Sequence, residues 1–132
     1  VEHTVTEEVT GLDLVALQLG IAAGRSLADL GIETPPAPRG YAIQLRVLAE
    51  EIDATGQSRP STQTVTLFEP PSGPGVRVDT AFRAGLAPHP AFDSMVAKLI
   101  VSTREPDYLR VLRRAMRAIS DFRIDGPRTN LD

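Results

Sequence analysis

The sequence predicts an α+β fold in which a mostly antiparallel sheet is flanked by helices. The chain has 132 residues, of which 42% are apolar and 23% charged, and this is typical of one globular domain with a single core. Strand-like segments cluster in the middle of the sequence, and helical segments lie nearer its ends. Because no helices alternate with the strands, an antiparallel sheet is favoured over a parallel β-α-β arrangement.

A first helix is predicted over residues 13–23. Asp13 or Thr10 can cap its start, and Gly24 can end it. A connector rich in proline follows at 35–40 and excludes a continuing helix. The apolar positions of the helix recur at helical spacing, at Leu14, Leu17 and Ile21.

Strands are predicted at 40–50, 62–68, 75–80 and 94–102. Side chains alternate between two faces in the first two, and the last has β-branched residues at its end. In the first of these, Ile43, Leu45 and Val47 share one face of the strand. Gln44 and Arg46 lie on the opposite face. An arginine in the middle of a strand points either to solvent or into a site.

A last helix is predicted over residues 107–122. Its expected apolar stripe consists of Leu109, Leu112, Met116 and Ile119. The arginines of this helix lie largely off the stripe, and we expect them to form a solvated face. Since no aromatic residues are interleaved with them, they do not indicate RNA binding.

Charge and cysteine content argue against several classes of protein. The net charge of −3 disfavours a nucleic-acid surface, and the lack of cysteine excludes disulfides and thiolate chemistry. No apolar run approaches the roughly 18 residues of a membrane helix, and the first residues are not those of a signal peptide. We therefore expect neither a nucleic-acid nor a membrane partner, and a cytoplasmic location fits the composition.

The start of the chain brings several acidic residues close to His3. Carboxylates and imidazole suit divalent cations, but the spacing matches no zinc motif, and His89 is the only other histidine. The alternative is an exposed acidic terminus. Arg46 is open to two interpretations as well, a solvated or salt-bridged arginine or a ligand-binding one. The acidic residues are Glu2, Glu7 and Glu8.

Five segments, in order along nearly the whole chain, resemble the biotin carboxylase family. They are VEHTVTEEVTGLDLV at 1–15, GYAIQLRVLAEE at 40–51, PPSGPGVRVD at 70–79, FDSMVAKLI at 92–100 and FRIDGPRTN at 122–130. The resemblance implies the C-terminal domain of a biotin carboxylase, with a mostly antiparallel, rolled sheet. It also implies that the chain begins on a strand of the active site, at residues 1–7.

The activity implied by this resemblance is the ATP-dependent carboxylation of biotin by bicarbonate. Glu2 matches the general base that deprotonates bicarbonate, and Val1 matches a residue whose backbone contacts bicarbonate. Arg46 matches the arginine that stabilises the enolate-like oxygen of biotin, so it is expected in both catalysis and substrate binding. Asp93 is expected to give structural or site support. A carboxylate base and a fixed guanidinium suit this chemistry.

Four residues depart from the family pattern, and one of them is Leu45, at a position where cysteine or another residue is common. Phe92 replaces a tyrosine and loses its hydroxyl, Tyr41 replaces a histidine, and Leu48 replaces an asparagine. Leu48 shares the strand face of Arg46, and an altered polar contact beside that arginine is therefore expected.

The resemblance also implies a larger parent protein, of which residues 1–132 are one domain. The ATP-grasp domain upstream would hold ATP and Mg²⁺, and a biotin carboxyl carrier domain and a carboxyltransferase would be the other partners. We expect the parent to form a homodimer, and the fragment neither to bind a metal nor to turn over alone. The alternatives are a non-catalytic dimerisation or interaction module and a relative of carbamoyl-phosphate synthase.

Overall fold

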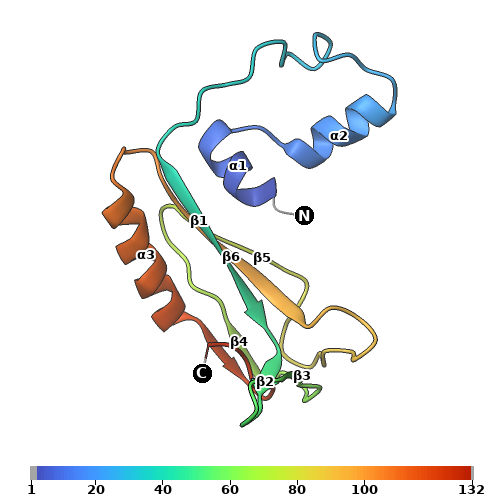
Figure 1. Ribbon diagram of the computed structural model, residues 1–132, viewed down its shortest axis with the longest axis vertical. Helices are drawn as coiled ribbons and strands as arrows, with labels where there is room; N and C mark the ends of the chain where they lie inside the picture. The colour runs from blue at the N-terminus through green and yellow to red at the C-terminus, as the bar shows by residue number, and fades with distance from the viewer. Residues whose placement is uncertain (1–2, 132) are drawn as a thin grey trace.

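A computed structural model describes residues 3–131 (Figure 1). The elements in chain order are α1 (His3–Thr10), α2 (Leu14–Ala22), β1 (Tyr41–Leu48), β2 (Glu50–Ile52), β3 (Ser58–Pro60), β4 (Leu67–Glu69), β5 (Val76–Thr80), β6 (Met95–Thr103), α3 (Tyr108–Asp121) and β7 (Arg123–Asp125). No helix in this part of the chain has the length and apolar character needed to cross a membrane.

The described strands pair only in antiparallel fashion. The main sheet has three strands in the order β1-β6-β5, and two small sheets pair β2 with β3 and β4 with β7. These strands do not close into a barrel. The predicted α+β class with a mostly antiparallel sheet is confirmed.

The core lies between α3 and one face of the main sheet. Val47 on β1 and Leu99 and Val101 on β6 are buried there, and Ile43 and Leu45 pack against the same cluster. The predicted alternation along β1 is therefore confirmed. From Ile43 to Val47 the odd-numbered side chains pack in or against the core, and Gln44 and Arg46 lie on the other face.

α3 begins where the sequence predicts but buries a different face. The Asp107 carboxylate accepts a hydrogen bond from the Arg110 amide at 3.0 Å and caps the helix. Three small residues face the sheet and are buried, namely Val111, Ala115 and Ala118. Of the predicted stripe only Ile119 packs against the core, and the prediction was wrong for three residues that are exposed, namely Leu109, Leu112 and Met116. Because these side chains are small, the backbone of α3 can approach the sheet closely on this face, and this face is therefore the one that is buried.

Residues 3–10 form helix α1, so the predicted strand at residues 1–7 is wrong for the residues that the structure describes. α1 buries Thr4 completely, and it ends at Gly11, whose φ of 75° favours glycine. The strand is expected from the family resemblance alone, whereas the side chains of Thr4, Glu7 and Glu8 hold the described segment against the sheet as a helix. Val1 and Glu2 lie outside the described residues.

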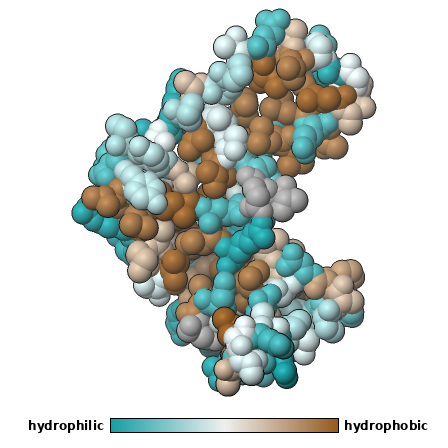
Figure 2. All heavy atoms as spheres, in the orientation of Figure 1, coloured by the Kyte–Doolittle hydropathy of each residue, from teal (hydrophilic) through white to brown (hydrophobic). Residues whose placement is uncertain are grey.

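α2 forms where a helix is predicted. Asp13 caps it, since its side chain accepts a hydrogen bond from the Ala16 amide at 2.9 Å. None of its residues is buried, and Val15, Leu19 and Ile21 are exposed. Hydrophobic atoms consequently gather on the lobe that contains α2 (Figure 2).

The strand predicted at 62–68 is mostly absent, because only Leu67–Glu69 forms β4. Val65 is fully buried, and its backbone is bonded to a loop: its amide donates to the Leu86 carbonyl, and its carbonyl accepts from the Gly85 amide. A local pattern cannot show that the backbone partners of a segment belong to a loop. The strands predicted at 75–80 and 94–102 are confirmed as β5 and β6.

We expect Leu99→Ala to lower the free energy of unfolding by about 2–5 kcal/mol, because it removes a fully buried side chain from the core. Leu109→Ala is the matched control. Leu109 is 58% exposed, and its replacement should cost less than about 0.5 kcal/mol. Urea denaturation of the two variants measures both values. Equal losses of stability in the two variants would contradict the finding that Leu99 on β6 is buried and Leu109 on α3 is exposed.

Candidate active site

One face of the main sheet carries mostly polar and charged side chains. The strand register arranges them in two rows that cross β1, β6 and β5. The first row is Arg46, Lys98 and Asp79, and the second is Gln44, Ile100 and Arg77. We call these six residues the polar face. α1 lies over the polar face, and α3 covers the opposite face of the sheet (Figure 1).

The first row places two positive charges side by side. Arg46 on β1 pairs directly with Lys98 on β6, and paired residues in antiparallel strands have Cβ atoms about 4.5–5.5 Å apart. Asp79 follows on β5 with one negative charge. The row therefore has a net positive charge, which suits an anion or a developing oxyanion.

Lys98 is a residue of this site that sequence reasoning missed. It is the only lysine of the chain and lies half-buried next to Arg46. The sequence feature that could have identified Lys98 is its place in the segment FDSMVAKLI, which resembles a segment of the biotin carboxylase family. Only the register of β6 against β1 reveals that it neighbours Arg46.

Asn130 is a second residue that sequence reasoning missed, and it holds the backbone of β1 at Arg46 and Leu48. Its side-chain amide donates to the Arg46 carbonyl at 2.9 Å. Its side-chain oxygen accepts from the Leu48 amide at 2.9 Å, and its own amide donates to the Leu48 carbonyl at 3.1 Å. The segment FRIDGPRTN therefore reaches the site through its last residue.

Arg77 joins α1 to the sheet. Its Nε and Nη2 atoms donate to the two oxygens of Asp79, at 2.8 and 2.7 Å. Its Nη1 atom reaches Glu7 at 3.0 Å and Glu8 at 3.4 Å. The hydrogen bonds with Asp79, and then those with Glu7, raise the pKa of Arg77 above its ordinary value. Arg77 is thus held as a cation among three carboxylates.

Neither interpretation of the acidic N-terminus fits its described residues. The Glu7 side chain is 11% exposed and the Glu8 side chain 26%, so these acids are not a solvated terminus. They pair with Arg77, although Glu7 also lies 3.9 Å from the imidazole of His3. Within residues 3–131 no group of His, Asp and Glu side chains is arranged to hold a metal ion.

Of the four predicted site residues, the structure describes Arg46 and Asp93. Asp93 precedes β6, at the end of the sheet where Arg46 also lies. Its carboxylate accepts a hydrogen bond from the Met95 amide at 2.9 Å, a contact typical of a turn that starts a strand. Glu2 and Val1 immediately precede α1 in the sequence and lie outside the described residues.

Two of the residues that depart from the family pattern, Tyr41 and Phe92, lie in different surroundings. Tyr41 is at the other end of β1 from Arg46 and stacks edge-on against Tyr108, with ring centroids 5.7 Å apart. Phe92 is 77% exposed, and its ring lies 5.3 Å from that of His89.

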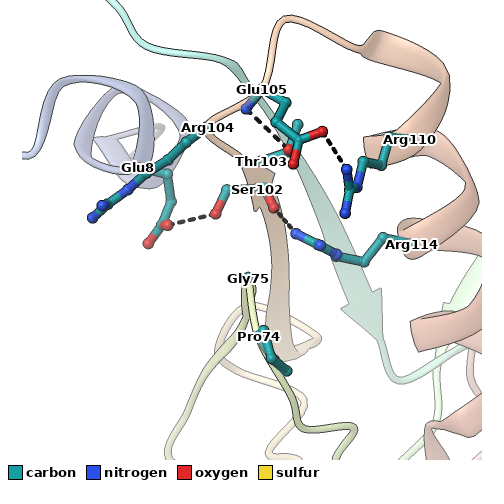
Figure 3. Close-up of a pocket in the computed structure, with 9 residues that line it drawn as sticks. All are labelled: Glu8, Pro74, Gly75, Ser102, Thr103, Arg104, Glu105, Arg110 and Arg114. Atoms are coloured by element: carbon teal, nitrogen blue, oxygen red, sulfur yellow. Dashed lines mark hydrogen bonds and ion pairs between the residues drawn. The ribbon is translucent and has the colours of Figure 1, made fainter.

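A pocket at the far end of β6 contains several charged groups that are already paired (Figure 3). Arg110 pairs with Glu105, and Arg114 donates to the carbonyl of Ser102. The Ser102 hydroxyl donates to Glu8 of α1 at 2.9 Å. This last bond is a second link between α1 and the sheet.

Glu50 joins the β2–β3 hairpin to the start of β6. Its carboxylate accepts hydrogen bonds from the hydroxyls of Ser58 and Ser94. These bonds, first that of Ser58 and then that of Ser94, lower the pKa of Glu50 below its ordinary value. The hairpin is thereby fastened beside the end of the sheet that carries Arg46 and Asp93.

The main sheet therefore has one apolar face packed against α3 and one largely charged face under α1. The family model described as "Biotin carboxylase C-terminal domain" matches residues 44–132. The chain belongs to this family. Residues 1–30 match a second model, "Carbamoyl-phosphate synthase L chain, ATP binding domain".

The chain is similar to curated biotin-dependent carboxylases. It is 42% identical to pyruvate carboxylase of Komagataella pastoris, over 99% of this chain and 11% of that protein. It is 44% identical to the biotin-dependent acyl-coenzyme A carboxylase alpha3 subunit of Mycobacterium leprae, over 96% of this chain and 20% of that protein. It therefore spans a fifth or less of these relatives.

Solved structures give the same result. A single-chain, multi-domain long-chain acyl-CoA carboxylase is 49% identical with a TM-score of 0.92, over 99% of this chain and 15% of that one. The biotin carboxylase domain of a single-chain bacterial carboxylase is 44% identical with a TM-score of 0.85, over 99% of this chain and 29% of that one. The predicted family is confirmed.

We expect Ser58→Ala to raise the pKa of Glu50 toward its ordinary value, because it removes the hydrogen bond that lowers this pKa most. A depressed folded pKa stabilises the fold above the unfolded pKa, and this stabilisation is lost as the pH falls through the folded pKa. In the variant the interval between the folded and the unfolded pKa is narrower, so the loss should be smaller in total and complete at a higher pH. NMR titration of the Glu50 carboxyl carbon measures the shift, with Ser72→Ala as a control. An unchanged titration would contradict the contact.

Proposed function

We propose that this domain supplies Arg46 and Glu2 to the ATP-dependent carboxylation of biotin by bicarbonate, in a larger biotin-dependent carboxylase. The observation that carries the proposal is the position of Arg46 beside Lys98 on the polar face. That face lies under α1, whose first residue directly follows Glu2 in the sequence. The family match and the carboxylase relatives support the reaction class.

The chemistry of these groups suits the reaction. A carboxylate at Glu2 can accept a proton from bicarbonate as a general base. The guanidinium of Arg46 presents fixed donors to the oxygen of biotin that gains negative charge when its neighbouring nitrogen is deprotonated. Lys98 adds a second positive charge next to that oxygen. Val1 would contact bicarbonate through its backbone, and Asp93 would support the end of the sheet.

The nucleotide and its magnesium are assigned to other parts of the parent protein. A related biotin carboxylase domain, from the 2-oxoglutarate carboxylase of Hydrogenobacter thermophilus, is 34% identical and was solved with MgADP, ADP and bicarbonate as a dimer. By this relationship we assign ATP and Mg²⁺ to an ATP-grasp domain. Biotin would arrive on a carrier domain, a carboxyltransferase would receive its carboxyl group, and the parent would be a homodimer.

In the parent carboxylase, we expect Arg46→Ala to slow biotin carboxylation by about 100-fold to 1,000-fold, the usual effect of removing an oxyanion donor. Bicarbonate-dependent ATP cleavage should fall much less, because Arg46 faces biotin in this proposal. Carboxybiotin formation and phosphate release are measured side by side.

Arg59→Ala is the matched control for this experiment. Arg59 is a 73% exposed arginine on the β2–β3 hairpin, paired with Asp53, and its loss should leave both rates unchanged. Equal losses of carboxylation and ATP cleavage in Arg46→Ala would count against a role at the biotin oxygen.

The isolated chain should show no ATP binding by titration calorimetry, since the groups that would hold the nucleotide are assigned to another domain. The full-length carboxylase is the positive control. Micromolar binding by the isolated chain would contradict this division of the site.

A further inference from the structure

We propose that Arg77 is a positioning residue that fixes α1 over the polar face of the sheet and acts in this way on the proposed base Glu2, which directly precedes α1 in the sequence. The proposal rests on the proposed function, because it takes Glu2 as the base. It assigns to Arg77 a role in the reaction without contact with the substrate.

Arg77 is well suited to fix α1 because its own position is set by the sheet. Its Nε and Nη2 atoms hold both oxygens of Asp79, two residues along the same strand. This two-pronged contact orients the guanidinium plane and leaves Nη1 directed at Glu7 and Glu8. An arginine oriented in this way loses little conformational freedom when it binds α1.

The contact holds α1 at one end, and a second contact holds it at the other. The hydroxyl of Thr4, which is fully buried, donates to the side-chain oxygen of Gln44 on β1. Thr4, Glu7 and Glu8 are three and four residues apart, so they lie on one face of the helix. Helix α1 is therefore attached to both outer strands of the sheet, β1 and β5, and these contacts oppose its rotation about its own axis.

A third contact strengthens the same attachment. The second oxygen of Glu8 accepts from the Ser102 hydroxyl on β6 at 2.9 Å (Figure 3). The second oxygen of Glu7 accepts from the Leu14 amide at 3.3 Å, where α2 begins. Arg77 is thus the cation that pairs with Glu7 and Glu8. The other carboxylate oxygen of each is already hydrogen-bonded, to the Leu14 amide and the Ser102 hydroxyl respectively.

Removing this cation would do more than loosen α1. Glu7, Glu8 and Asp79 surround one guanidinium, and without it their negative charges would repel one another. The repulsion would push α1 away from β5. Gln44, the anchor of Thr4, is two residues from Arg46 on the same strand face, so the displacement would occur next to the first row of the polar face.

The test uses the full-length carboxylase. We expect Arg77→Met to lower kcat for biotin carboxylation about 10-fold to 100-fold, because a base misplaced by about 1 Å loses much of its effect. The KM for ATP should change less than about twofold. Arg77→Lys, which keeps the charge but not the fork, should recover part of the rate. Arg59→Met is the control and should match the wild type.

A purely structural role is separated by combining variants. If Arg77 acts through Glu2, then Arg77→Met should cause no further loss of rate in a Glu2→Gln background. An equal fold-loss in both backgrounds would overturn the positioning role. Should Arg77→Met fail to fold, Glu7→Gln, which weakens the same ion pair, replaces it in this comparison with the same two outcomes.

The two proposals fail differently. A wild-type rate in Glu2→Gln overturns the assignment of the base, whatever Arg77→Met does. A slow Glu2→Gln together with a wild-type Arg77→Met overturns the positioning role alone.

Discussion

The antiparallel register of β1 against β6 is the constraint on which the rest of this structure depends. Side chains alternate between the two faces of a strand, so a shift of one residue would exchange the faces. In the observed register Val47 enters the core, and Arg46 meets Lys98 on the other face. The core and the candidate site are therefore two results of one pairing, and neither could be moved without the other.

The two faces of the sheet are covered by different means. α3 lies against the apolar face through small side chains such as Ala115 and Ala118, and apolar burial stabilises that contact. α1 lies over the polar face, where Thr4, Glu7 and Glu8 bind sheet side chains by hydrogen bonds and ion pairs. Such contacts depend on direction, so they fix the orientation of α1 on the sheet.

The sequence predicts much of the fold but only part of the site. Alternation predicts β1, and a run with β-branched residues at its end predicts β6. The spacing of apolar residues after Asp107 predicts α3, and all of these signals are local. The sequence does not predict α1 as a helix, since the contacts of Thr4 and Arg77 that hold it come from distant strands. For the same reason Lys98 and Asn130 escape detection, although Arg46 is visible as a charge in mid-strand.

Asn130 also covers backbone groups of β1, the strand that carries Arg46. β1 is an outer strand of its sheet, and an outer strand offers free backbone groups to any extended chain. Asn130 occupies the Arg46 carbonyl and both backbone groups of Leu48. Asn130 lies 82 positions from Leu48 along the chain. Its bonds leave fewer backbone groups beside Arg46 available to pair with a strand of another molecule. The segment at 122–130 thus covers backbone groups through which an outer strand could otherwise pair with an extended chain.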